Sequence, residues 1–244
     1  MTDSYSSLSP AAHDAGSALV VGANGGLGAA FVQALRSQKR YAQVLAISRT
    51  SEPAIDYAQE ASLAQAAQWV GAQCADAPLR LVIVATGMLH INGAGPEKSF
   101  ANIDAAYLQS VFAVNAIGPA LLLKHFAPLL PKQGDVRVVM LSAKVGSMGD
   151  NALGGWIGYR ASKAALNQIV KTASIELLRR NKASICVALH PGTVDTALSK
   201  PFGKTGLNVR APAVAADEIL GVIHGLTALD TGSFVDYLGA KLPW

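Results

Sequence analysis

The sequence predicts an α/β protein in which a doubly wound parallel sheet forms the middle layer of a three-layer α/β/α sandwich. One observation is a series of short, β-branched apolar runs, whose near-continuous hydrophobicity implies strands buried on both faces. These runs are residues 18–21, 44–47, 79–85, 136–141 and 185–189. The other observation is that longer stretches with helical spacing separate the runs. Parallel strands need such crossovers, and right-handed crossovers place helices on both sides of a sheet.

Two of the intervening stretches show an apolar helix face. In the first, the apolar positions are Leu27, Ala30, Phe31, Ala34 and Leu35. In the second, they are Ala164, Leu166, Ile169, Val170, Ala173 and Leu177, with Leu166 off the centre of the stripe. Spacings of three and four residues are those of an amphipathic helix, so both stretches are predicted to pack against the sheet.

Length and composition indicate one well-buried domain. The chain has 244 residues, of which 51% are hydrophobic and 15% charged. No repeat, long linker or charge block marks the start of a second domain. We therefore expect a disordered tail over residues 1–16 and a single domain over 17–244. Residues 197–212, which carry two glycines and three basic residues, are expected to form a long loop.

Several classes of protein are disfavoured. The net charge of +4 is scattered along the chain, which argues against nucleic-acid binding. The N-terminus has no secretory pattern, and polar residues and a proline interrupt the apolar stretch 113–130, so no membrane span is expected. Cys74 and Cys186 stand far apart and the histidines form no metal-binding group, so no metal site is predicted. These features predict a cytoplasmic protein.

A glycine-rich turn lies between the first apolar run and the first helix. In a Rossmann-type fold, backbone amides and the helix dipole at this place hold a pyrophosphate. Gly22 permits the turn, while Gly26 and Gly28 keep side chains away from the closest approach. The alternative is a turn that only packs strand on helix. The predicted cofactor-binding residues are Gly22, Asn24, Gly25, Gly26, Leu27 and Gly28.

The end of the second apolar run predicts which dinucleotide binds. Ser48 and Arg49 stand where the adenosine ribose meets the strand tip, and no carboxylate is present there. Arg49 can pair with a 2′-phosphate and Ser48 can donate to it, which favours NADP(H) over NAD(H). NAD(H) is the alternative cofactor, and Arg49 as a solvated surface charge is the alternative interpretation.

Tyr159 and Lys163 are four residues apart and therefore share one helix face. A nearby ammonium favours phenolate, so Lys163 is expected to lower the pKa of Tyr159 and suit it to proton transfer. Ser142 follows the run 136–141, at the carboxyl edge where open α/β sheets bind ligands. A hydroxyl at this edge can polarise a carbonyl.

With a glycine-rich turn followed by Asn115, Ser142 and Tyr-x-x-x-Lys in that order, the sequence resembles the short-chain dehydrogenase/reductase family. The resemblance covers roughly residues 18–239. It implies that Tyr159 is the general acid/base and that Ser142 hydrogen-bonds the substrate oxygen. It also implies that Lys163 holds the nicotinamide ribose and that Asn115 anchors a water in a proton relay.

The same resemblance implies further cofactor contacts. Asp56 and Tyr57 resemble an adenine-contacting pair, and residues 191–196 resemble the Pro-Gly segment near the nicotinamide. Residues 85–87 depart from the usual Asn-Asn-Ala-Gly, which leaves backbone contacts as the expectation there. An insertion at 150–155 would loop out beside the site. Together with residues 88–90, 96–98 and 190–196, it resembles the C-factor-like branch. The added cofactor-binding candidates are Asp56, Tyr57, Ala85, Thr86, Gly87, Pro191, Gly192, Val194 and Thr196.

These residues predict an NADP(H)-dependent oxidoreductase of the carbonyl reductase type, acting on a small ketone, aldehyde or alcohol. The alternative is a dinucleotide-binding signalling or scaffold protein with little turnover, because fold alone does not establish function. A third hypothesis is an isomerase, epimerase or dehydratase that uses bound nicotinamide. The family resemblance also implies a homo-oligomer, a dimer or tetramer, and Phe234, Val235, Leu238, Leu242 and Trp244 could be covered by a partner subunit or by the chain's own core.

Overall fold

The computed structural model describes residues 16–91, 93, 95–200 and 208–244, so most of the predicted tail and the middle of the predicted 197–212 loop lie outside it. Within these residues, six parallel strands form one sheet in the order β2-β1-β3-β4-β5-β6. The strands are β1 (Ser17–Val21), β2 (Gln43–Ile47), β3 (Leu79–Val84), β4 (Val136–Leu141), β5 (Ser184–His190) and β6 (Phe234–Asp236). The parallel sheet confirms the predicted fold class.

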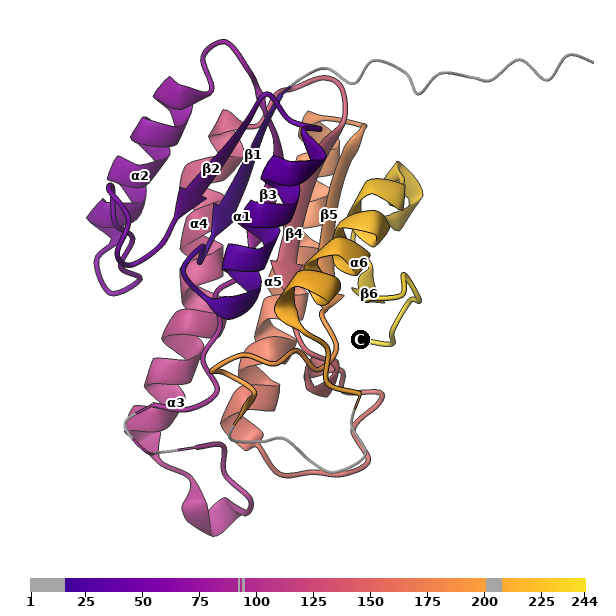
Figure 1. The fold of residues 1–244 in the computed structure, drawn as a ribbon. Coiled ribbons are helices and arrows are strands. Elements are labelled where there is room, and N and C mark those ends of the chain that lie inside the picture. Colours follow the sequence, from indigo (N-terminus) through magenta and orange to yellow (C-terminus); the bar gives the residue numbers. More distant parts are fainter. Residues whose placement is uncertain (1–15, 92, 94, 201–207) are drawn as a thin grey trace, which may run out of the picture.

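Helices cover both faces of the sheet. In Figure 1, α1 and α6 lie in front of the sheet, and α2, α4 and α5 lie behind it. α3 continues into α4 through a π-helical turn, η2 (Ala113–Ile117). The helices are α1 (Gly26–Gln38), α2 (Glu60–Gln73), α3 (Ala105–Phe112), α4 (Gly118–Phe126), α5 (Ile157–Arg180) and α6 (Pro212–Gly225).

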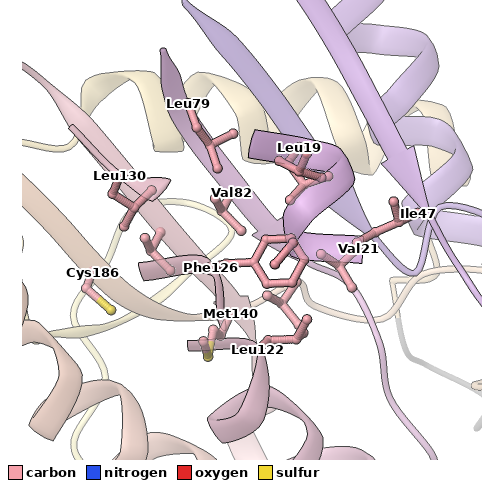
Figure 2. Close-up of a cluster of buried hydrophobic side chains, with 14 of the residues drawn as sticks. Leu19, Val21, Ile47, Leu79, Val82, Leu122, Phe126, Leu130, Met140 and Cys186 are labelled. Carbon is pink, nitrogen blue, oxygen red and sulfur yellow. The ribbon is translucent and has the colours of Figure 1, made fainter. Parts of the chain in front are cut away.

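β1 shows why the strand runs are apolar at every position. All five of its residues are buried. Side chains alternate across a strand, so Leu19 and Val21 enter the cluster under α2, α4 and α5, whereas Ala18 and Val20 enter the cluster under α1 and α6. Figure 2 shows the first cluster, with the Phe126 ring of α4 among strand side chains.

The order in which successive strands are added to the sheet reverses at β1, although all strands stay parallel. β2 lies on one side of β1 and β3 on the other, which makes the carboxyl ends of β1 and β3 the switch point at which open α/β sheets bind ligands. The backbone is tight there. The Ala85 amide donates to the Val21 carbonyl at 2.8 Å, and a Cβ on Gly22 would lie 2.9 Å from Cγ2 of Thr86. This contact places residues 85–87 directly beside the glycine-rich turn.

The predicted face of α5 was wrong in one respect. Leu166 is 2% exposed and lies at the centre of the buried face, whereas Ile169 lies at its margin. The reason is that polar residues occupy this face too, since Tyr159, Lys163 and Asn167 are all buried. A count of apolar side chains alone therefore misplaced the centre of the face.

The C-terminal segment supplies a sixth strand that the sequence did not predict. β6 has only three residues, and it pairs in parallel with the end of β5. Phe234 and Val235 are each 1% exposed within the chain's own core, and the Phe234 ring stacks on Trp244 with centroids 5.9 Å apart. Leu238, in contrast, is 71% exposed. The chain's own core therefore covers the strand residues.

The stretch Ala105–Leu129 is long and apolar enough, by length and composition, to cross a membrane, with a mean hydropathy of 1.5 over an 18-residue window. The core helix of a soluble protein passes the same test. Tyr107, Val111, Leu122 and Phe126 are buried, and α4 lies along the sheet in Figure 1. Within the described structure, α4 is part of the helical layer that it forms with α2 and α5.

Candidate active site

Helix α5 and the end of β4 bring Tyr159, Lys163 and Ser142 to the carboxyl edge of the sheet. Ser142 is the first residue after β4, and the Lys163 Nζ donates to the carbonyl of Leu141 at 2.9 Å. The same Nζ lies 6.0 Å from the centroid of the Tyr159 ring. The three side chains predicted from separate motifs therefore lie in one region of the structure.

Burial determines the acidity of the two titratable groups. Lys163 is 3% exposed, and desolvation lowers its pKa to about 8. Tyr159 is 7% exposed, and desolvation, with a smaller contribution from Tyr107, raises the pKa of its phenol well above the ordinary value. The expected lowering of the phenol pKa by Lys163 is thus not found, because the phenol is buried and the ammonium is bonded to Leu141.

Ser142 is held by a residue that the sequence analysis missed. Its hydroxyl donates to Oδ1 of Asn167 at 2.6 Å, and its amide donates to the Leu189 carbonyl at 2.7 Å. Asn167 follows Lys163 by four residues, as Lys163 follows Tyr159, so the three share a helix face. Extending the Tyr159–Lys163 spacing by one more turn would have identified it.

Asn115 lies in the π-helical turn and is fully buried. Its Nδ2 donates to the Met88 carbonyl at 2.8 Å and to Oγ of Ser162 at 3.0 Å, and its Oδ1 accepts from the Met88 amide at 2.8 Å. π-helical turns are frequent at functional sites. The side chain joins the segment after β3 to α5, and so brings residue 115 to the catalytic candidates.

The glycine-rich turn fits a dinucleotide pyrophosphate. Gly25 is the N-cap of α1 and provides no side-chain cap for the first-turn amides. Such amides, with the helix dipole, bind phosphate. Space is limited around the turn, because a Cβ on Gly28 would lie 2.1 Å from the Gly22 carbonyl oxygen and one on Gly26 would lie 2.9 Å from Cγ2 of Thr196. Gly25 and Gly26 are themselves exposed, so a ligand can reach them.

The two residues at the tip of β2 differ in accessibility. Arg49 is exposed, and among the described residues no hydrogen bond or ion pair of its guanidinium is found. Ser48 is 4% exposed, and its hydroxyl accepts from the Thr50 amide at 3.2 Å. Asn24 reaches the same turn by donating to the Thr50 hydroxyl. Arg49 is therefore the accessible group, whereas Ser48 is engaged in its own turn.

Asp56 and Tyr57, the two residues proposed to contact adenine, have different surroundings. Asp56 is exposed, and its carboxylate accepts from the Ala58 amide at 2.9 Å, which closes its own turn. Tyr57 shares a hydrogen bond of 2.8 Å with the Thr86 hydroxyl, and its ring lies where a Cβ on Gly118 would be 2.3 Å away. Tyr57 therefore connects the 85–87 segment with the start of α4.

The segment 191–196 crosses towards the glycine-rich turn, which Thr196 touches at Gly26. Gly192 has a φ of +68°, and Val194 is 5% exposed. A second missed residue holds this segment: the Arg210 guanidinium donates to the Pro191 carbonyl and lies 3.6 Å from the centroid of the Tyr237 ring. Arg210 has no local motif, so nothing in the sequence pattern marked it.

The parallel sheet, the glycine-rich turn at its switch point and the Tyr159–Lys163 helix define a dinucleotide-binding oxidoreductase. The sequence profile of the short chain dehydrogenase family matches residues 17–206, and the chain belongs to that family.

Among its relatives, the C-signal of Myxococcus xanthus is 34% identical over 160 residues, covering 63% of this chain and 90% of that protein. The 1-hydroxy-2-glutathionyl-2-methyl-3-butene dehydrogenase of Rhodococcus sp. (strain AD45) is 29% identical over 204 residues, covering 83% of this chain and 84% of that protein. An NADPH-bound carbonyl reductase from chicken fatty liver has a similar structure, with a TM-score of 0.81 and 25% identity over 93% of this chain and 94% of that chain. The carbonyl reductase Sniffer of D. melanogaster shares the fold, with a TM-score of 0.81 and 23% identity over 95% of this chain and 100% of that chain.

Proposed function

We propose that the protein is an NADP(H)-dependent carbonyl reductase, which reduces a ketone or aldehyde to an alcohol or catalyses the reverse. The observation that carries the proposal is the buried group of Ser142, Tyr159 and Lys163 at the carboxyl edge of β4. The glycine-rich turn fits the cofactor phosphates, and a bound nicotinamide dinucleotide supplies the hydride in this chemistry.

The chain's own residues carry the proton and orient the substrate. Tyr159 donates its phenolic proton to the carbonyl oxygen as the carbon accepts the hydride, so that one C–H and one O–H bond form while the C=O double bond becomes single. Ser142 donates a hydrogen bond to the same oxygen and polarises it. Lys163 would hold the nicotinamide ribose with its ammonium. The low exposure of all three side chains keeps water from competing for these bonds.

Arg49 supports NADP(H) as the preferred cofactor, with NAD(H) as the alternative. Its guanidinium is accessible at the tip of β2, where it can pair with the 2′-phosphate in a charge-assisted hydrogen bond. The carbonyl reductase from chicken fatty liver has NADPH bound, which is consistent with this choice.

A panel of aldehydes and ketones, incubated with the protein and either NADPH or NADH, tests the proposal. The loss of reduced-nicotinamide absorbance should depend on protein and substrate and should be faster with NADPH. Binding of NADPH without turnover of any carbonyl or alcohol in either direction would contradict the proposed activity.

That contrary outcome would favour the second candidate, a dinucleotide-binding signalling or scaffold protein. The similarity to the C-signal of Myxococcus xanthus favours this candidate, because the match covers most of that protein. The presence of Ser142, Tyr159 and Lys163 together favours catalysis, since binding alone does not need a proton donor.

Two further expectations belong to the proposal. We propose a homo-oligomer, a dimer or tetramer, associating through the helices around Asn115 and Tyr159. Ile117 before α4 and Ile175 on α5 are 52% and 47% exposed and could enter such an interface. Light scattering at micromolar concentration tests this, and a monomer mass would contradict it. The cytoplasmic location stays a prediction from the sequence.

A further inference from the structure

Three consecutive residues before α5 have a left-handed backbone. Gly154, Gly155 and Trp156 have φ values of +63°, +65° and +55°. Glycine adopts this conformation freely, but a bulky residue rarely does. The other described non-glycine residue with positive φ is Lys39 at the C-cap of α1, where the conformation is common. Trp156 instead stands at the N-cap of α5, where an extended backbone is usual.

Glu97 holds this turn from the opposite loop. Its carbonyl accepts from the Trp156 amide at 2.5 Å, and its Oε2 accepts from the Gly158 amide at 3.1 Å. Glu97 is 4% exposed, and it stands in for the side-chain cap that α5 lacks. A Cβ on Gly158 would lie 2.6 Å from Cδ2 of Leu108 and 2.9 Å from Oε1 of Glu97, so these side chains would have to move to admit one. The start of the helix that carries Tyr159 is therefore clamped by a buried carboxylate.

Arg160 holds the turn from the helix side. Its Nε donates to the Gly155 carbonyl at 2.9 Å, and its Nη2 donates to the Gly154 carbonyl at 3.2 Å. In the structure its guanidinium is committed to the insertion that precedes α5.

The clamped turn aims the indole of Trp156 at Tyr159. The two ring centroids are 6.2 Å apart and the planes meet at 73°, an edge-to-face arrangement that aromatic pairs favour. Trp156 is half-buried and Tyr159 is buried, so the indole is the more exposed of the two rings. Glycine would adopt the left-handed backbone at residue 156 without strain. The feature that tryptophan adds at this position is therefore its ring.

We infer that Trp156 is a positioning residue for Tyr159, whose indole fixes the phenol ring and covers it from water. The catalytic meaning of this inference rests on the proposed function, but the contact with the phenol does not. The titratable groups that face the phenol are Lys163 on the same helix and Tyr107 on α3, and Tyr107 is in turn influenced by Glu97 on the loop before α3.

Trp156→Gly is the sharpest test, because glycine relaxes the backbone and removes only the ring. Ionisation of Tyr159 is measured from the near-ultraviolet phenolate band during a pH titration, after subtracting the spectrum of the same protein with Tyr159→Phe. The exposed phenol should titrate about one pH unit lower than in the wild type. Turnover should fall about tenfold with NADPH affinity unchanged, and Trp156→Phe should restore both readouts.

Lys39→Gly is the matched control, since it also replaces a left-handed residue by glycine, at a helix end far along the chain from Tyr159. It should leave the phenol titration and turnover unchanged. If Trp156→Gly does not fold, Trp156→Leu carries the same expectation. Wild-type phenol titration and turnover in a folded Trp156 variant would overturn the inference. A wild-type protein without any turnover would overturn the proposed function instead, while the substrate-free titration would still decide the role of Trp156.

Discussion

The candidate site has two ends, a cofactor end at the glycine-rich turn and the tip of β2, and a catalytic end at Ser142, Tyr159 and Lys163. Their polar groups differ in exposure and in whether they already have hydrogen-bond partners within the chain. At the cofactor end, Gly25, Gly26 and Arg49 are exposed, and the first-turn amides of α1 have no side-chain cap. At the catalytic end, Ser142 and Lys163 are almost fully buried and bonded to Asn167 and to the Leu141 carbonyl. The difference teaches that the proposed cofactor end is open to a ligand, whereas the proposed catalytic groups are also part of the folded core.

The largest expected effect is that of Tyr159→Phe on turnover. Removing a positioned general acid costs about 10²- to 10⁴-fold in rate, and the change keeps the ring volume. NADPH affinity, measured by fluorescence or calorimetry, should stay close to wild type, which would separate the two ends of the site. Tyr41→Phe, just before β2 and thus at the amino edge of the sheet, is the control that should leave turnover unchanged. Near-wild-type turnover in Tyr159→Phe would remove Tyr159 from the catalytic assignment.

Gly28→Ala should damage the cofactor end through the backbone. A Cβ there would lie 2.1 Å from the Gly22 carbonyl oxygen, and forcing the turn open should destabilise the fold by about 1–3 kcal/mol. NADPH affinity should fall together with the midpoint of thermal unfolding. Gly25→Ala is the matched control for thermal unfolding, because the nearest atom to its Cβ would be 3.3 Å away and its φ of −74° suits any residue. Equal effects of the two substitutions would show that the close contact is not what requires glycine.

His190, at the end of β5, should make the catalytic end sensitive to acid. Burial, together with Lys144 and Arg210 and against Asp236, lowers its pKa from 6.5 to about 4. Between these values the unfolded chain binds more protons than the folded chain, so stability falls as the pH falls from 6.5 towards 4. The loss should be on the order of 1–3 kcal/mol in denaturant unfolding. His190→Gln should remove this part of the pH dependence, while His125→Gln, which alters a half-buried pair with Glu60, should retain it.

The smallest expected effect is that of Arg49→Asp on cofactor choice. The substitution replaces the accessible cation at the tip of β2 with a charge that repels a 2′-phosphate and can bind free ribose hydroxyls. The ratio of NADPH to NADH affinity should shift by about tenfold or more towards NADH, measured by titration of each cofactor. Stronger binding of NADH than NADPH by the wild type would contradict the assignment of Arg49.

The features that could be predicted from the sequence are those whose signal is local. Buried parallel strands are apolar at every position, and the glycine-rich turn and Tyr159–Lys163 each lie within a few residues of chain. The groups that hold these motifs gave no such signal. Glu97 caps Gly158 from 61 residues away, and Arg210 reaches Pro191 from 19 residues away. Such contacts depend on which loops become neighbours in the folded structure, and no local pattern in a single sequence indicates this.

Asn115 has a consequence for the interpretation of mutations. One amide joins the Met88 backbone to Ser162, and the whole side chain is buried. Leaving either partner unsatisfied costs about 1–3 kcal/mol, a loss that any activity assay of an Asn115 variant would include. A double-mutant cycle between Asn115→Ala and Ser162→Ala isolates the free energy of the hydrogen bond between the two side chains. The coupling energy of the cycle belongs to that bond, and the remaining loss belongs to the other bonds of each residue. Without that cycle, a dead Asn115 variant would report on the assembly of three chain segments as much as on chemistry.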